Sequence, residues 1–448
     1  MMDDGREAIL YRDGRRGHPV ITHGKGATLW DTEGKAYLDG CGGPFVVTIG
    51  HGVTEIAEAM RAQADRVAYA HTVRFVTEPL LALSRRVVAL APPGLSRVFW
   101  VGSGSEATEA AMRIARAYHL ARGRSSKHKV IGRWGSYHGM TLGALAMGGR
   151  PESRRALAPI LPNLPHIPPA YCYRCPWGKT YPGCRIDCAE ALEDAIRYEG
   201  PENVSAFIAE PILGSFMGVT VPPPEYFPRI REICDRYDVL LIADEIVTGF
   251  GRTGRPFAIE HSRVTPDLLT MGKGITSGYA ALAGVLVRDS VAAALAAGPP
   301  ASLGGHTYAA NPVACAAGVA VLDYTAKHQL FDRVIPLGEH LFRRARAVLG
   351  ALAIVGDIRG KGLLMGLELV ADRATRTPFP VEAGVAKRVA DRAFDKGLYI
   401  QAGSGWADGL PGDYPCLAPP YVATEAEIDR MIEILAEALR EVQASIRH

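Results

Sequence analysis

The chain has 448 residues, of which 48% are hydrophobic and 22% charged, and its formal net charge is +3. This length exceeds what one hydrophobic core usually supports, so we expect a globular protein with two or more packed units. The nearly balanced charge argues against nucleic acid or an acidic membrane surface as the main partner. The N-terminus lacks an apolar signal-peptide core, and prolines and glycines interrupt the uncharged stretch Ser290–Leu322. We therefore expect a cytoplasmic protein without a membrane span.

Apolar runs alternate with amphipathic segments through the middle of the chain, which indicates a mostly parallel sheet with helices between its strands. A helix is predicted at Ser105–Arg122, where small and apolar residues recur at helical spacing. The predicted strands are Arg97–Val101, Lys129–Arg133, Val204–Glu210, Val239–Asp244 and Leu282–Val287. Their continuous apolar character is typical of parallel strands buried on both faces.

The regions after this middle part differ from it in proline content and in the spacing of apolar residues. Pro151–Gly183 is rich in proline and is predicted to be a long ordered loop or insertion. After about Thr325 the pattern favours a smaller α+β domain. We place an N-terminal segment at residues 1–50, packed with the small domain, a large domain at 51–325, and the small domain at 326–448. The large domain contains a Cys- and Pro-rich insertion at 151–190.

The segment Gly102–Ala107 (GSGSEA) follows a predicted strand and opens a predicted helix. Ser103 and Glu106 have the spacing of a capping box. The small residues leave free N–H groups and the positive end of the helix dipole facing outward, which is the arrangement of a phosphate site. A simple capped helix is the alternative for this motif taken alone.

Two further segments carry chemically distinctive side chains. Asp244 and Glu245 end an apolar strand, and open α/β sheets bind ligands at the carboxyl ends of their strands. A structural ion pair is the alternative. Lys273 lies between Gly272 and Gly274, and a desolvated lysine can form a Schiff base with a carbonyl. A phosphate-binding or surface lysine is the alternative there.

The three features together predict an enzyme that uses pyridoxal 5′-phosphate (PLP). The helix start anchors the cofactor's phosphate. Asp244 keeps the pyridine nitrogen protonated, so that the ring can act as an electron sink. Lys273 holds the aldehyde and later moves the proton.

Over nearly its whole length the sequence resembles the class III (ω-type) aminotransferases of PLP fold type I. The most diagnostic segment is Asp244–Gly254 (DEIVTGFGRTG). The other matching segments are Ser103–Ala107, Tyr137–Gly139, Ala209–Ile212, Gly272–Gly274, His306–Tyr308 with Asn311–Pro312, Arg359–Gly366 and Pro419–Pro420. The resemblance implies an α/β fold, with a large domain on a seven-stranded, mostly parallel sheet and a smaller α+β domain.

The resemblance also implies a role for each matched residue. Lys273 would form the internal aldimine, and Asp244 would pair with the pyridine nitrogen. The other cofactor contacts would come from Ser103, Gly104 and Ser105 at the phosphate, Tyr137 and Ile246 on the two ring faces, His138 beside Tyr137, and Glu210 near the phenolic oxygen. Thr307 would reach the phosphate of the neighbouring subunit, which implies a homodimer with shared active sites, or a tetramer built from such dimers. Phe45 would form an aromatic wall of the substrate pocket.

One departure concerns the substrate. Many family members carry an arginine shortly before the paired prolines, where it binds a substrate carboxylate. The stretch Ala393–Asp429 contains no arginine, and Gln401 and Trp406 occupy this neighbourhood. We expect Trp406 to line the pocket, and donors without a carboxylate to be used at least as well as short ω-amino acids. An arginine from the N-terminal segment or from the partner, such as Arg74, is the alternative carboxylate site.

Four cysteines lie together in the insertion, at Cys172, Cys175, Cys184 and Cys188. We expect reduced thiols that pack the loop. A structural zinc is the alternative, although the second spacing is at the edge of the usual pattern. No metal is expected to take part in the chemistry.

The predicted function is amino transfer from a primary amine or ω-amino acid to a 2-oxo acid, pyruvate or 2-oxoglutarate, by a ping-pong mechanism through the Lys273 aldimine. A decarboxylating transaminase or an aminomutase on the same scaffold is the first alternative. A binding protein with a vestigial site is the second, and the joint presence of Lys273 and Asp244 argues against it.

Overall fold

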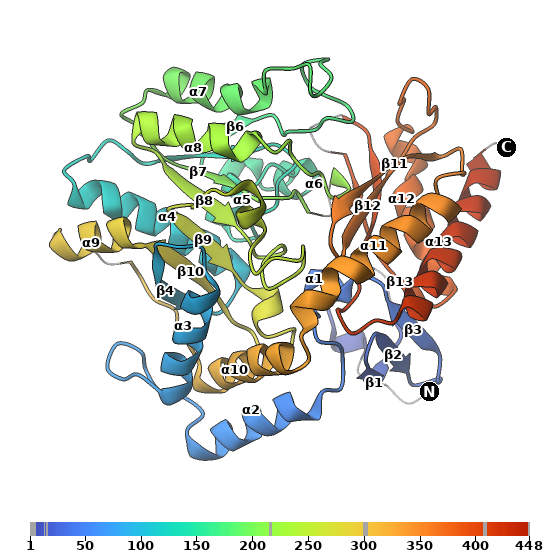
Figure 1. Ribbon diagram of the computed structural model, residues 1–448, viewed down its shortest axis with the longest axis horizontal. Helices are drawn as coiled ribbons and strands as arrows, with labels where there is room; N and C mark the ends of the chain where they lie inside the picture. Colours follow the sequence, from blue (N-terminus) through green and yellow to red (C-terminus); the bar gives the residue numbers. More distant parts are fainter. Residues whose placement is uncertain are drawn as a thin grey trace.

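The computed structural model describes residues 6–12, 14, 17–214, 217–298, 303–405 and 410–446. Figure 1 shows a larger body, in which helices surround a central sheet, and a smaller body that contains the C-terminal helix. Among the described residues, no helix combines the length and the apolar character that crossing a bilayer requires.

The central sheet has seven strands, and its topology confirms the predicted fold class. Its order is β4 (Leu95–Val101), β10 (Ala283–Arg288), β9 (Leu268–Met271), β8 (Leu240–Asp244), β7 (Val204–Ala209), β5 (Lys129–Arg133) and β6 (His166–Ile167). Only β10 runs antiparallel to its neighbours, and the strands from β9 to β6 are parallel. Every residue of β7, β8 and β9 is buried, as the continuous apolar runs predicted.

Helices cover both faces of this sheet because successive side chains of a strand point to opposite sides. Ala206 and Ile208 of β7 share a core with α4 (Gly104–Ala121) and α9 (Asp289–Ala297), whereas Phe207 packs on the other face. The helices that contribute to that second core are α3 (Glu78–Leu90), α7 (Asp187–Glu199), α8 (Tyr226–Tyr237) and α10 (Pro312–Lys327). Helix α2 (Thr54–Arg66) lies against α10.

The smaller body combines both ends of the chain. The strands β1 (Ile21–Lys25), β2 (Thr28–Asp31) and β3 (Ala36–Asp39) form a sheet that β13 (Leu398–Tyr399) extends in parallel to β3. A second sheet has the order β11 (Val355–Lys361), β12 (Leu364–Leu369), β15 (Asp413–Leu417) and β14 (Gln401–Ser404). The helices are α11 (Leu330–Val348), α12 (Val385–Asp395) and α13 (Glu425–Ile446). Ile49 and Ile56 belong to the same core as Leu341 and Leu435, so residues from both ends are buried together.

The proline-rich stretch 151–183 is more regular than the loop that the sequence predicted. It contains α6 (Pro151–Arg155), the 3-10 turn η2 (Ala158–Ile160) and the short edge strand β6. Pro151 stands at the start of α6, where a fixed φ suits the helix and no N–H is needed.

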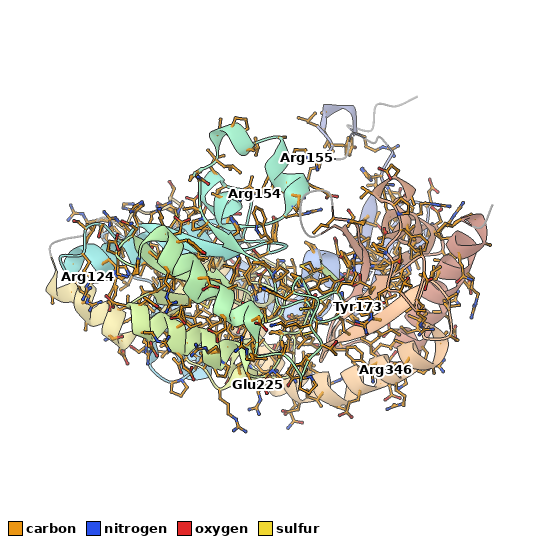
Figure 2. All side chains as sticks on the ribbon, turned by 90° about the horizontal axis from the view of Figure 1, so that it is seen from above. Arg124, Arg154, Arg155, Tyr173, Glu225 and Arg346 are labelled. Atoms are coloured by element: carbon orange, nitrogen blue, oxygen red, sulfur yellow. The ribbon has the colours of Figure 1, made fainter. Side chains whose placement is uncertain are left out.

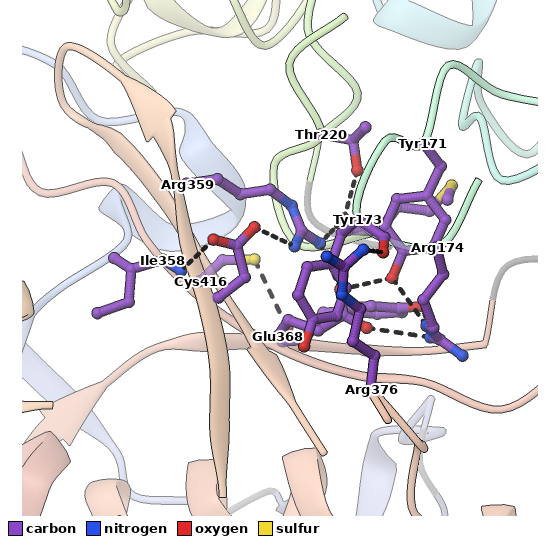
Figure 3. Close-up of polar contacts among 12 residues, drawn as sticks. Tyr171, Tyr173, Arg174, Thr220, Ile358, Arg359, Glu368, Arg376 and Cys416 are labelled. Carbon is purple, nitrogen blue, oxygen red and sulfur yellow. Dashed lines mark hydrogen bonds and ion pairs between the residues drawn. The ribbon is translucent and has the colours of Figure 1, made fainter. Parts of the chain in front are cut away.

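Glu368 of β12 attaches the second half of this insertion to the small domain. Its carboxylate accepts from Tyr171 at 2.5 Å, from Arg174 at 3.0 Å and from Arg359 at 2.7 Å. Figure 3 shows these side chains converging from the insertion loop and from β11 onto β12. Glu368 is fully buried, and the two arginines supply the counter-charge that such a carboxylate requires.

Candidate active site

Three of the predicted site segments meet at the carboxyl edge of the central sheet. Asp244 ends β8, Lys273 follows β9, and α4 begins after β4. The strands β8 and β9 are parallel neighbours in which Asp244 stands opposite Thr270, whose hydroxyl donates to Asp244 Oδ1 at 2.9 Å. The parallel arrangement therefore brings the carboxylate and the lysine to one place although they are distant in sequence.

His138 is the second partner of Asp244. Its Nδ1 lies 2.6 Å from Asp244 Oδ2, and both side chains are buried. Burial disfavours the charged ring, but the charge of Glu210 and the hydrogen bond to Asp244 outweigh it, so the pKa of His138 lies above its ordinary value. The His138 ring therefore binds its second proton more readily than an ordinary histidine, and it contacts the Asp244 carboxylate directly.

Glu210 closes this polar cluster at the end of β7. Its carboxylate accepts from the backbone N–H of Tyr137 at 3.0 Å and lies 3.3 Å from the Arg133 guanidinium. Arg133 is fully buried and also donates to the Glu210 carbonyl at 2.6 Å. Arg133 was not among the predicted site residues. A charged residue at the end of an apolar strand was the only signal for it.

Lys273 opens the 3-10 turn η5 (Lys273–Ile275) in a left-handed backbone conformation, with φ of 43°. Burial lowers the pKa of its amine to about 8; Asp244 opposes this shift and Arg252 adds to it. The Nζ atom lies 5.8 Å from the centre of the Phe45 ring. The amine therefore loses its proton more readily than an exposed lysine, and the unprotonated amine is the form that attacks a carbonyl.

The N-terminus of α4 has free backbone donors. Ser103 Oγ accepts from Glu106 N at 3.3 Å, and Glu106 Oε2 accepts from Gly102 N at 2.7 Å, so the predicted cap is present. The first helical hydrogen bond joins Ala107 N to Ser103 O. The N–H groups of Gly104 and Ser105 precede it and remain available to an anion at the positive end of the helix dipole.

Ile246 lies between the helix start and the lysine turn. A Cβ atom on Gly104 would stand 3.3 Å from its Cγ2, and one on Gly272 would stand 3.1 Å from its Cδ1. Both glycines let the backbone approach this side chain closely. Asp244 Oδ1 also accepts from Ile246 N at 3.1 Å, which fixes Ile246 beside the carboxylate.

The remaining predicted residues occupy different surroundings. Tyr137 is half-buried next to Glu210, and Phe45 is buried with φ of 63°. Thr307 lies on an exposed turn before α10, next to His306, whose Nδ1 is 3.6 Å from Glu106 Oε1 in the first turn of α4. Trp406 lies outside the described residues.

Arg252 is a further residue close to the site, and the sequence identified it only as part of the segment Asp244–Gly254. Its guanidinium is fully buried and donates to the carbonyls of Val47, Leu363 and Pro419, at 2.7 to 3.2 Å. It lies 4.8 Å from the centre of the Tyr421 ring. Arg252 thus joins the N-terminal segment and the small domain to the loop after β8, close enough to Lys273 to influence its charge.

The four insertion cysteines line one cavity of about 20 Å³ together with Trp177 and Tyr181. All four are free thiols, and burial raises the pKa of Cys188 to about 12. Within the described ranges, no group of three or more His, Cys, Asp or Glu side chains is arranged to hold a metal ion. The geometry therefore lends no support to the zinc alternative.

The donor set at the sheet edge fits PLP. A helix N-terminus suits the phosphate. A buried carboxylate with one lone pair on Oδ2 beyond those used by His138, Thr270 and Ile246 suits a protonated pyridine nitrogen, and an amine with a lowered pKa suits the aldehyde. A side chain on Gly104 or Gly272 would push Ile246 by a few tenths of an ångström, so both glycines help to keep this side chain in place.

With this sheet and this site, the chain falls among the PLP-dependent enzymes of fold type I. Within that class it belongs to the class III aminotransferases, whose family model matches residues 11–439. Enzymes of this family depend on PLP. The family and the cofactor that the sequence predicted are thereby confirmed.

Similar proteins cover almost the whole chain. The uncharacterized aminotransferase YodT of Bacillus subtilis is 36% identical over 96% of this chain and 97% of its own length. The putrescine–pyruvate aminotransferase of Pseudomonas aeruginosa is 34% identical over 96% of this chain and 92% of its own. The crystal structure of an (S)-enantioselective ω-transaminase from Thermomicrobium roseum aligns with a TM-score of 0.89 and 36% identity, over 97% of this chain and 95% of that one.

Proposed function

We propose that this aminotransferase moves the amino group of a primary amine or ω-amino acid to a 2-oxo acid, pyruvate or 2-oxoglutarate, by a ping-pong mechanism. The observation that carries the proposal is the meeting of Lys273, its pKa lowered to about 8, with the buried carboxylate of Asp244. The Pseudomonas aeruginosa relative, a putrescine–pyruvate aminotransferase, supports an amine donor and a 2-oxo acid acceptor.

When bound, PLP supplies the electron sink that stabilises the carbon from which a proton is removed. The chain supplies the rest. The N–H groups of Gly104 and Ser105 bind the phosphate and set the position of the ring. Asp244, held by His138 and Thr270, keeps a proton on the ring nitrogen. Lys273 Nζ, in its unprotonated form, would take the proton from the amine-bearing carbon of the substrate and deliver it on the other side of the shared nitrogen, so this lysine would act as the proton shuttle.

The donor pocket of this enzyme favours amines without a carboxylate. Ala393–Asp429 contains no arginine, and Phe45 offers an apolar wall 5.8 Å from Lys273 Nζ. A donor carboxylate placed against this wall would be desolvated without a partner. Specificity constants for butylamine or benzylamine should therefore equal or exceed those for β-alanine and 4-aminobutyrate. A preference for the amino acids beyond about tenfold, or about 1.4 kcal/mol, would contradict this donor class.

The same donor panel, run with pyruvate and with 2-oxoglutarate, tests the reaction itself. A carbonyl product from the donor and alanine or glutamate from the acceptor, in equal amounts, is the expected result. Release of carbon dioxide would identify a decarboxylating transaminase, and transfer of the amino group within one molecule would identify an aminomutase. Either of these results would overturn the proposed reaction.

We propose further that two chains form a dimer with shared sites. Thr307 is exposed, and beside it Tyr308 is 69% exposed and packs against Tyr69 with ring centres 6.3 Å apart. The adjoining loop exposes Val73, Phe75 and Val76, each by more than 60%. An apolar group of this kind on a surface marks a protein contact, and a second copy would bring Thr307 to the partner's phosphate site.

Mixing two inactive variants tests this shared site. Lys273→Ala removes the amine from one chain, and Thr307→Glu places a negative charge at the phosphate of the partner's site. Co-expression should restore up to about a quarter of the wild-type activity, because half of randomly formed dimers are hybrids with one intact site. If no activity returns although hybrid dimers form, Thr307 does not act across the interface.

A further inference from the structure

Arg150 lies beside the tyrosine loop of the active site. Gly149 pairs with the segment that leads to Tyr137, through Gly149 N to Ser136 O and Gly135 N to Gly149 O, both at 3.0 Å. A Cβ atom on Gly149 would stand 2.2 Å from the Arg133 carbonyl, so only glycine permits this approach. The backbone that carries Arg150 is therefore held against the loop that carries Tyr137.

The side chain of Arg150 is in an unusual electrostatic environment. It is only 23% exposed, and burial lowers its pKa below the ordinary value. The charge of Arg12 lowers this pKa further, so two guanidinium groups come close together. Arg12 also influences Tyr399, whose pKa burial raises to about 12. The charge of Arg12 thus acts on both Arg150 and Tyr399, which connects the N-terminal segment to both of them.

Glu152 is the carboxylate that pairs with Arg150, at 2.8 Å. Its side chain is 54% exposed, and its other oxygen accepts from Ser404 Oγ at 2.6 Å. Ser404 ends β14, so this contact links the large domain to the small one. An ion pair in which one side chain is this exposed contributes little to stability. Another carboxylate that binds Arg150 more tightly can therefore replace Glu152.

Arg154, which lies close to Arg150 in the sequence, already has several hydrogen-bond acceptors in the structure. Arg154 donates to the carbonyls of Leu145, Ala146 and Gly148 and lies 5.7 Å from the Trp134 ring, so it caps the C-terminal end of α5 (Leu142–Met147). Figure 2 shows Arg154 and Arg155 on α6, the short helix that Arg150 immediately precedes. Arg150 differs from Arg154 in that it pairs with an exposed carboxylate, and Tyr137 lies within reach of its charge.

We propose that Arg150 binds the carboxylate of the 2-oxo acid acceptor, and that this carboxylate displaces Glu152. The inference rests on the proposed function, because it requires a 2-oxo acid as acceptor. A guanidinium next to Tyr137 binds a planar carboxylate in a two-point contact that lysine does not reproduce. When an amine without a carboxylate occupies the site, Glu152 returns to Arg150, so the half-buried cation always has a partner. One site can thus accept an uncharged donor and an anionic acceptor in turn.

The test compares two acceptors in the second half-reaction. The holoenzyme, with its cofactor in the amine form, is reacted with pyruvate or with butanal, which lacks a carboxylate. Arg150→Gln should raise the KM for pyruvate at least about tenfold and leave the reaction with butanal within about twofold. Arg150→Lys should recover only part of the loss. The butanal reaction also shows whether the variant is folded and carries its cofactor.

Two further variants sharpen the comparison. Glu152→Gln removes the competing carboxylate and should lower the KM for pyruvate, whereas an increase would overturn the displacement. Arg61→Gln, a matched change at a side chain that is 85% exposed on α2, should alter neither acceptor. An unchanged ratio of kcat/KM for pyruvate and butanal in Arg150→Gln would overturn the assignment of Arg150. A wild-type enzyme that transfers no amino group to any 2-oxo acid would instead overturn the proposed function.

Discussion

His138 donates a hydrogen bond from Nδ1 to Oδ2 of Asp244 over 2.6 Å, and solvent reaches neither side chain. The other carboxylate oxygen accepts from Thr270 and from Ile246 N. The carboxylate is therefore held in one orientation from two sides. His138, whose pKa is raised, places positive charge behind Asp244. The hydrogen bonds leave one lone pair on Oδ2 of Asp244, where a protonated ring nitrogen can donate.

Replacing Asp244 by Asn should reduce kcat by roughly 10²-fold or more while the protein still binds PLP, because the ring loses the ionic partner that maintains its electron sink. Glu245→Gln is the matched control. Glu245 is equally buried, but it faces the backbone of Ala258 and Ile259, and burial raises its pKa to about 7. Its amide variant should keep kcat within about threefold. Equal losses in both variants would show that the effect of Asp244 is structural.

The pKa of Lys273 sets a pH profile for cofactor loading. Because the folded-state pKa is lowered to about 8, the amine is protonated below this pH and free above it. The rate at which cofactor-free enzyme takes up PLP should rise with pH and level off above about 8, whereas an exposed lysine would titrate near 10.4. Stopped-flow absorbance between pH 6 and 10 measures this midpoint. Lys273→Ala should give no covalent adduct and slow turnover by roughly 10⁴-fold.

The pair of His138 and Asp244 also predicts a pH-dependent stability of the cofactor-free protein. Since the folded-state pKa of His138 is raised, its contribution is fully present below the unfolded value of about 6.5 and disappears as pH rises through the folded value. His138→Asn should therefore lower the melting temperature more at pH 6 than at pH 9. Thermal denaturation of both proteins at the two pH values measures the difference. An equal loss at both would contradict the raised pKa.

Glu368→Gln should destabilise the protein through the contact between the insertion and the small domain. The change leaves Arg359 and Arg174 without the carboxylate that they share, and removing one partner of a buried ion pair costs roughly 3 kcal/mol. We expect a melting temperature lower by several degrees. Glu232→Gln, at a surface pair with a 63% exposed side chain, is the control and should change it little. No difference between the two variants would contradict a structural role for Glu368.

The sequence by itself determined the family and the cofactor of this protein and five of the seven strands of its central sheet; β9 and β6 were not among the predicted strands. Asp244 ends a predicted apolar strand, and open α/β sheets bind ligands at this end of their strands, so its place at the site follows from local pattern and topology. The capped start of α4 at Ser103 was equally local, because a cap uses groups within a few residues. The dimer, the cytoplasmic location and the identity of the donor stay predictions.

Only the tertiary structure decided which distant side chains complete the site. Arg133 of β5 reaches Glu210 at the end of the neighbouring β7, whereas His138, on the loop after β5, reaches Asp244 of β8 on the far side of β7. Arg252 finds its acceptors in three separate segments, and Arg150 is brought to Tyr137 by the pairing around Gly149. The spacing of apolar residues along the chain does not predict such pairs of distant side chains. They depend on the packing of segments that are far apart in the sequence, and this packing is fixed only in the folded chain.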